Sequence, residues 1–107
     1  MTRLALPNRR PSELISFEHE GISYEGSVSF DLRTGAPAEI FLDGGTVGSA
    51  VQSVARDSAV AASLALQHGA SLALLRGALT RQDDGSPAGP LGRLLDLIGA
   101  GGWGSGF

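Results

Sequence analysis

Residues 22–32 read ISYEGSVSFDL, and apolar side chains take almost every second position of this stretch. Serines and acidic residues fill the positions between them, and a period of two is typical of a β-strand with one buried face. Gly26 falls on the apolar side, where a bulge or a close packing contact suits a glycine. The stretch predicts a strand whose core-facing residues are Ile22, Tyr24, Val28, Phe30 and Leu32.

Two further strands are predicted, one on each side of this strand. Residues 14–20 (LISFEHE) precede it, and Glu20-Gly21 has the composition of a tight hairpin turn. Residues 38–43 (AEIFLD) follow it after RTGAP, which is turn chemistry. The first half of the chain is therefore expected to form a three-stranded antiparallel meander with one polar face.

A long helix is predicted over residues 48–69, with Ser49 as its N-cap and Gly69 at its end. Steps of 100° per residue divide this helix into two sides. Ser58 lies at the centre of the apolar side, where we expect it to bond to the carbonyl of Val54. The apolar side holds Val51, Val54, Ser58, Ala61, Ala62 and Ala65, and the polar side holds Gln52, Arg56, Ser63 and Gln67.

The rest of the chain predicts two short helices joined by a loop. They cover residues 71–80 and 90–98, and Pro90 suits the first position of the second one. Residues 81–90 contain Asp-Gly and two prolines, which favour a loop. Strands followed by helices predict an α+β fold, in which one long and two short helices pack on one face of the sheet.

The expected organisation is one domain with an extension at each end. Residues 1–10 form an N-terminal arm, residues 11–98 the α+β domain, and residues 99–107 a glycine-rich tail. Trp103 and Phe107 in the tail could dock on a protein surface. The open sheet face and the edge strands would suit a homodimer.

The composition excludes several classes of function. The net charge is −3 and all eight basic residues are arginine, so a strongly basic surface for binding nucleic acid is not indicated. Arg9, Arg10 and Arg81 make only a weak positive patch. The chain has no cysteine and two histidines, so neither a metal site nor a cofactor is expected. We expect His68 to cap the long helix and His19 to lie on the surface.

The same residues argue against an enzyme. Ser58 and His68 are ten positions apart in one predicted helix, about 15 Å by helix rise, so they cannot form a nucleophile–base pair within one chain. No apolar stretch is long enough to span a bilayer, and the first residues do not resemble a signal peptide. A cytoplasmic protein without catalytic activity is the expectation.

The glycine-rich turn FLDGGTVGSA, residues 41–50, joins the third strand to the long helix and has two interpretations. It can be an anion or nucleotide site, because glycines let backbone N–H groups approach a phosphate at a helix N-terminus. It can equally be a turn that Ser49 caps. No Gly-Lys-Ser/Thr follows, so a Walker loop is excluded. The candidate ligand-binding residues are Gly45, Thr46, Gly48, Ser49, Gln52 and Arg56.

Several short motifs recur in the order and spacing of a known family: Glu39-Ile40-Phe41, Gly48-Ser49, Arg56-Asp57 and SLALQHG at 63–69. The chain resembles the TSCPD domain, the small C-terminal module of vitamin B12-dependent (class II) ribonucleotide reductases, which also occurs in free-standing small proteins of bacteria and prophage-like regions. The Thr-Ser-Cys-Pro-Asp stretch is missing here, as is the catalytic barrel, so no redox or metal role carries over.

The resemblance implies an α+β fold and an association with nucleotide metabolism. On this basis the first hypothesis is a non-enzymatic nucleotide- or anion-binding regulatory module, for example a prophage-type nucleotide-binding or sequestering protein. The alternative is a protein–protein interaction module that acts as a homo-oligomer or docks on a larger enzyme. The small residues of the long helix favour this second hypothesis.

Overall fold

The computed structural model describes residues 12–100 of the chain, and the arm residues 1–10 and the side chains of Trp103 and Phe107 lie outside this range. Three strands are followed by three helices. The strands form one antiparallel sheet in the order β1-β2-β3. The elements are β1 (Ser12–His19), β2 (Ile22–Phe30), β3 (Pro37–Gly44), α1 (Ala50–Gln67), α2 (Leu72–Ala78) and α3 (Pro90–Ala100).

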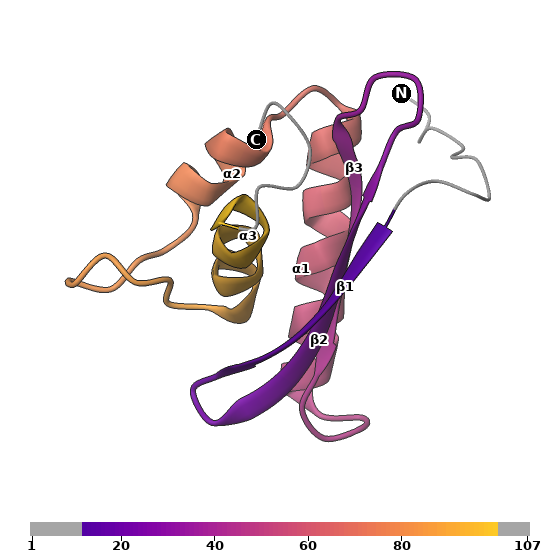
Figure 1. Ribbon diagram of the computed structural model, residues 1–107. Helices are drawn as coiled ribbons and strands as arrows, with labels where there is room; N and C mark the ends of the chain where they lie inside the picture. Colours follow the sequence, from indigo (N-terminus) through magenta and orange to yellow (C-terminus); the bar gives the residue numbers. More distant parts are fainter. Residues whose placement is uncertain (1–11, 101–107) are drawn as a thin grey trace.

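The helices lie on one face of the sheet, and Figure 1 shows α1 running along β3 while α3 lies beside it over the other strands. This confirms the predicted α+β fold. The two short helices are also present, and Ser71 caps α2 by accepting a hydrogen bond from the N–H of Leu74 at 3.0 Å. No helix within residues 12–100 combines the length and the apolar character needed to cross a membrane.

The predicted hairpin between β1 and β2 is confirmed. Glu20 and Gly21 have φ angles of 54° and 77°, the left-handed pair that a two-residue type I′ turn requires. The turn aligns His19 with Ile22 and Phe17 with Tyr24. It therefore sets the register of the sheet, and the Phe17 and Tyr24 rings stack with their centroids 5.6 Å apart.

The central strand ends two residues earlier than predicted, at Phe30 rather than Leu32. Asp31 begins a turn in which its N–H donates to the carbonyl of Ala36 at 2.9 Å and its carboxylate accepts from the N–H of Arg33 at 2.8 Å. A side chain that bonds its own backbone two residues on competes with strand pairing. Leu32 consequently lies outside the strand with 52% of its surface exposed.

The core lies between the sheet and the helices. Gly26 is needed there, because a Cβ at this position would lie 2.6 Å from a methyl group of Leu94 in α3. This confirms the expected close contact, which brings α3 against β2. The buried apolar residues are Tyr24, Val28, Phe30, Ala38, Ile40, Leu42, Ala55, Ala59, Ala62, Leu66, Leu72, Leu94, Leu95 and Ile98.

The prediction of which side of α1 is buried is wrong. Of the predicted set only Ala62 is buried, whereas Val51 and Val54 are exposed. Ser58 is half-buried, and its hydroxyl donates to the carbonyl of Ala55 at 2.8 Å rather than to that of Val54. The residues that α1 buries are Ala55, Ala59, Ala62, Ser63 and Leu66.

The polar side of α1 faces β3, the strand at one edge of the sheet. The hydroxyl of Ser63 accepts from the N–H of Ile40 at 2.8 Å, and its O–H lies 3.0 Å from the carbonyl oxygen of the same residue. Gln67 donates from Nε2 to the carbonyl of Ala38 at 2.9 Å. Buried backbone groups at a sheet edge need such partners. These contacts explain why α1 is rotated away from the orientation that its apolar residues alone predict.

Replacing Ser63 by Ala should lower the free energy of unfolding by about 1–3 kcal/mol, because it leaves the buried N–H of Ile40 without its acceptor. The matched control is Ser58→Ala, which removes only a bond within α1 and should cost less than about 0.5 kcal/mol. Urea unfolding followed by circular dichroism measures both variants. Equal losses would show that the contact with β3 contributes nothing specific.

Candidate functional site

The glycine turn occupies the junction between β3 and α1, as predicted. Gly45 and Gly48 have φ angles of 78° and 81°, which favour glycine, and they reverse the chain between the two elements. Ser49 caps α1 by accepting from the N–H of Gln52 at 3.2 Å, and its own N–H donates to the carbonyl of Thr46 at 3.0 Å. The cap predicted from the sequence is therefore confirmed.

The two longest side chains of the candidate site bind a carboxylate of the chain itself. Arg56 donates from Nε to Oδ1 of Asp43 at 2.9 Å, and Gln52 donates from Nε2 to the same oxygen at 3.2 Å. The Oε1 atom of Gln52 accepts from the N–H of Gly48 at 2.8 Å. The hydrogen bond from Arg56, followed by that from Gln52, outweighs partial burial and lowers the pKa of Asp43.

Sequence reasoning did not single out Asp43. It lies at the end of β3, and no helical or strand spacing links a strand residue to Gln52 or Arg56 in the following helix. Its position directly before the glycine turn was the only available signal. In the structure it takes the position that an external anion would need in order to reach Arg56.

Two hollows lie beside this turn. One, of about 400 Å³, lies between the hairpin turn and the N-terminus of α1, and three of the six candidate residues line it. The other, of about 490 Å³, opens on the sheet face that carries no helix, where Glu18, Glu25 and Asp43 line it. The lining of the first is Gly21, Ile22, Ser23, Gly45, Thr46, Ser49 and Val51.

The residues that line the two hollows have opposite effects on anion binding. Glycine backbone and a helix N-terminus favour an anion in the first hollow. The carboxylates of the neighbouring hollow oppose it, because Glu25 lies directly across from Asp43 in the β2–β3 register. The structure thus brings Gly45, Thr46 and Ser49 together around one hollow. It directs Gln52 and Arg56 to Asp43.

The outward face of α1 differs from the usual surface of a helix. Nine residues of α1 are exposed, and six of them are alanine, valine or leucine. The charged residues among the nine are Arg56, which binds Asp43, and Asp57. A helix that faces water normally carries polar side chains there. We define the outward face as Ala50, Val51, Val54, Val60, Ala61 and Leu64.

The two histidines have different surroundings. His19 was expected on the surface, but it is half-buried, and its Nε2 lies 2.9 Å from the carbonyl oxygen of Ala88, to which it can donate. The main-chain N–H of His68 ends α1 by donating to the carbonyls of Leu64 and Ala65. Within the described part of the chain, no group of three histidine or acidic side chains could hold a metal ion.

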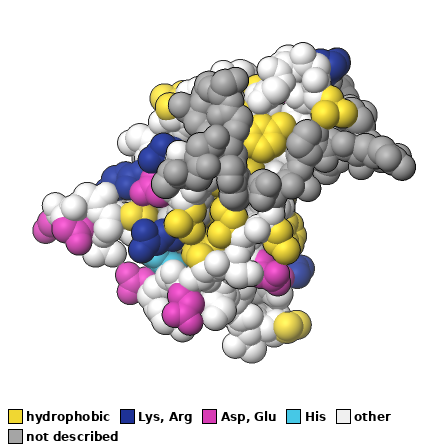
Figure 2. All heavy atoms as spheres, in the orientation of Figure 1, with side chains coloured by type: hydrophobic (Ala, Val, Ile, Leu, Met, Phe, Trp, Pro, Cys, Tyr) yellow, Lys and Arg dark blue, Asp and Glu magenta, His cyan; other side chains and the backbone are white. Residues whose placement is uncertain are grey.

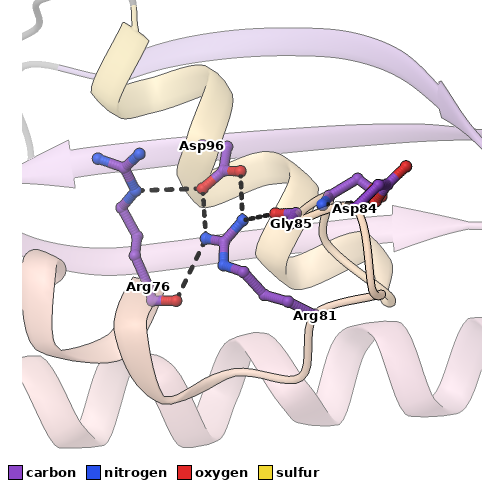
Figure 3. Close-up of polar contacts among 6 residues, drawn as sticks. Arg76, Arg81, Asp84, Gly85 and Asp96 are labelled. Carbon is purple, nitrogen blue, oxygen red and sulfur yellow. Dashed lines mark hydrogen bonds and ion pairs between the residues drawn. The ribbon is translucent and has the colours of Figure 1, made fainter.

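A second polar cluster connects the other two helices. Asp96 of α3 accepts a forked pair of bonds from Arg81, at 2.8 and 2.9 Å, and a further bond from Arg76 of α2 at 3.2 Å (Figure 3). Arg81 also donates to the carbonyls of Gly85 and Arg76. Its charge is therefore compensated by Asp96 and adds little to a positive patch. The cluster fixes the loop between α2 and α3.

Comparison of the chain with protein-family models, with curated proteins and with solved structures gives no match. The TSCPD resemblance therefore stays a prediction.

The Asp96 cluster should make stability depend on pH. Hydrogen bonds from Arg81, and then from Arg76, lower the pKa of Asp96 below its ordinary value of 3.8. The carboxylate therefore stabilises the fold fully above that value, and its contribution is lost as the pH falls through the lower, folded-state pKa.

Asp96→Asn should accordingly lower the free energy of unfolding by about 1 kcal/mol at neutral pH, since the cluster is partly exposed to water. The difference from wild type should shrink below about pH 4. Denaturant unfolding over a pH series measures it, with Asp83→Asn in the exposed loop as the control. A difference that stays constant down to the acid limit would contradict the assignment.

Proposed function

We propose that this chain is a non-enzymatic regulatory module that acts by docking on another protein. The outward face of α1 carries the proposal. It is an exposed helix surface made of alanine, valine and leucine, and removing such apolar surface from water is favourable for binding. Val54 is 65% exposed, and Val47 in the preceding turn is a further exposed valine.

The side chains of this face indicate what kind of surface the partner should present. Helical spacing places the exposed Asp57 among these residues, and it has no ion pair with the described residues. The partner should therefore present an apolar surface with a basic or hydrogen-bond-donating group opposite Asp57, because covering an unpaired carboxylate is costly. Small residues such as Ala50 and Ala61 would let a partner helix approach closely. If the TSCPD resemblance holds, the partner is a nucleotide-handling enzyme that the module regulates.

Site-specific cross-linking tests this proposal. A photoreactive phenylalanine analogue at position 54 or 60, introduced in cells that encode the chain, should give an adduct with one partner of defined mass. The same analogue at position 32, an exposed leucine in the β2–β3 turn, is the control and should give none. Val54→Asp should abolish the adduct formed from position 60. Equal cross-linking from all three positions would contradict the proposal.

A second candidate function is the binding of a small phosphate-bearing molecule, which the hollow of about 400 Å³ at the N-terminus of α1 favours. Thr46, Gly45 and Ser49 would surround the anion. Arg56 would have to exchange its bond with Asp43 for one with the ligand. Substitution of Arg56 therefore distinguishes the two interpretations of the turn, an anion-binding site and a simple capped turn.

A nucleotide at 100 times its dissociation constant should stabilise the fold by about 2.7 kcal/mol and raise the melting temperature by roughly 10 °C. Arg56→Ala should remove the increase. Arg33→Ala, which breaks an ion pair with Asp31 in the β2–β3 turn, should retain it. Differential scanning fluorimetry with a panel that includes cyclic nucleotides measures the effect. No increase across the panel would rule out this second function.

A further inference from the structure

The two edges of the sheet differ in their hydrogen bonding. At the β3 edge, Ser63 and Gln67 of α1 bind outward backbone groups of Ile40 and Ala38. At the β1 edge, no described residue hydrogen-bonds to the corresponding backbone groups. An open strand edge is a template for pairing with another strand.

The hairpin turn determines which backbone groups of β1 are available. His19 and Ile22 flank a two-residue turn, so they form a hydrogen-bonded pair. Alternation along the strand then directs the backbone groups of Ile15 and Phe17 toward β2 as well. The N–H and C=O groups of Leu14, Ser16 and Glu18 point outward.

Apolar side chains accompany this open edge on both faces of the sheet. Ile15 and Phe17 pack against the core but stay partly exposed. Leu14 on the opposite face is 65% exposed. Figure 2 shows hydrophobic side chains gathered over α3 and beside the neighbouring strands on this side of the molecule. The core is thus incompletely covered along β1.

We propose that β1 pairs antiparallel with β1 of a second copy, which joins the two sheets into one of six strands. A two-fold axis perpendicular to the sheet keeps both cores on the same side. With the axis at Ser16, the two Ser16 residues face each other, and Ile15 lies opposite Phe17 of the second copy. Pairs of β-branched and aromatic residues are favourable across strands.

Charge does not oppose this register. Glu18 lies opposite Leu14 of the second copy, so no two like charges face each other. The two Glu18 residues are four positions apart along the paired strands, about 13 Å. That separation exceeds the Debye length of about 8 Å at physiological ionic strength, so salt largely screens their repulsion.

Residues 1–11 of the same chain suit this edge less well than a second copy. Pro7 and Pro11 have no N–H to donate to a strand ladder. The segment also leads directly into β1 at Ser12, so it would need part of its length for a turn before it could run back along the strand. A second β1 has the full eight residues and no proline.

The dimer would leave the outward face of α1 open. Since α1 lies at the β3 end of each sheet, the two copies would present their α1 helices at opposite ends of the six strands (Figure 1). The β1 pairing does not depend on the proposed function, and Val54→Asp should leave the dimer unchanged.

Sedimentation velocity of the full chain tests the proposal. The wild type should sediment in the micromolar range with twice the mass of the 10.9 kDa chain. Ser16→Pro removes an outward N–H that β2 does not use, so it should weaken the dimer at least tenfold while circular dichroism stays unchanged. Ser16→Ala keeps that N–H and should stay dimeric. A monomeric wild type, or a Ser16→Pro variant that dimerises as tightly, would overturn the proposal.

Hydrogen exchange of the wild type gives a test that does not depend on how a variant folds. The amides of Leu14, Ser16 and Glu18 should exchange slowly at concentrations where the dimer forms, and faster on dilution. The amides of Ile15 and Phe17, which bond to β2, are the internal reference. Outward amides that exchange rapidly at every concentration would overturn the pairing.

Discussion

The hydroxyl group of Ser63 connects the long helix to the edge of the sheet, and the orientation of α1 depends on this contact. It accepts from the N–H of Ile40 and lies within donating distance of the carbonyl oxygen of the same residue, while Ser63 itself is only 1% exposed. Gln67 extends the contact to Ala38. Because buried backbone groups must be paired, these two side chains fix the rotation of α1 about its axis.

The rotation decides which residues of α1 face outward. With Ser63 turned toward β3, alanines pack beneath the sheet, and the valines at 51, 54 and 60 face outward. The same rotation brings Gln52 and Arg56 to Asp43. One hydrogen-bonding constraint thus favours a protein-docking function for α1 and makes anion binding at the glycine turn depend on the release of Arg56.

The difference between the two sheet edges suggests how copies of the chain would assemble. Side chains of α1 bind part of the β3 edge, whereas no described residue binds the outward groups of β1, and this difference favours a closed pair through β1 over an open chain of copies. The hairpin turn and the Asp96 cluster hold the parts around β1 in place, since Gln82 of the loop before α3 donates to Glu20 in the turn. Self-association and docking would therefore use separate surfaces.

The sequence by itself determined the elements and their order. The alternation in β2, the Glu20-Gly21 turn and the serine caps of the helices follow from local backbone geometry, which nearby residues encode. The alternation also placed Gly26 on the core face, but only the packing of Leu94 from α3 makes a glycine necessary there. The end of β2 was predicted too late, because the side chain of Asp31 competes for the backbone through contacts that alternation does not reveal.

The tertiary structure decided the rotation of α1, the pairing of Arg56 and the contrast between the two edges. A prediction from helical periodicity assigns the side with the most apolar residues to the core. In α1 the apolar valines lie on a different side from the small alanines that fit beneath the sheet. The backbone of an edge strand demands hydrogen bonds from residues more than twenty positions away, such as Ser63 for Ile40. The spacing of residues within one helix or strand cannot predict these hydrogen bonds, because they form only when the sheet and the helix are packed together.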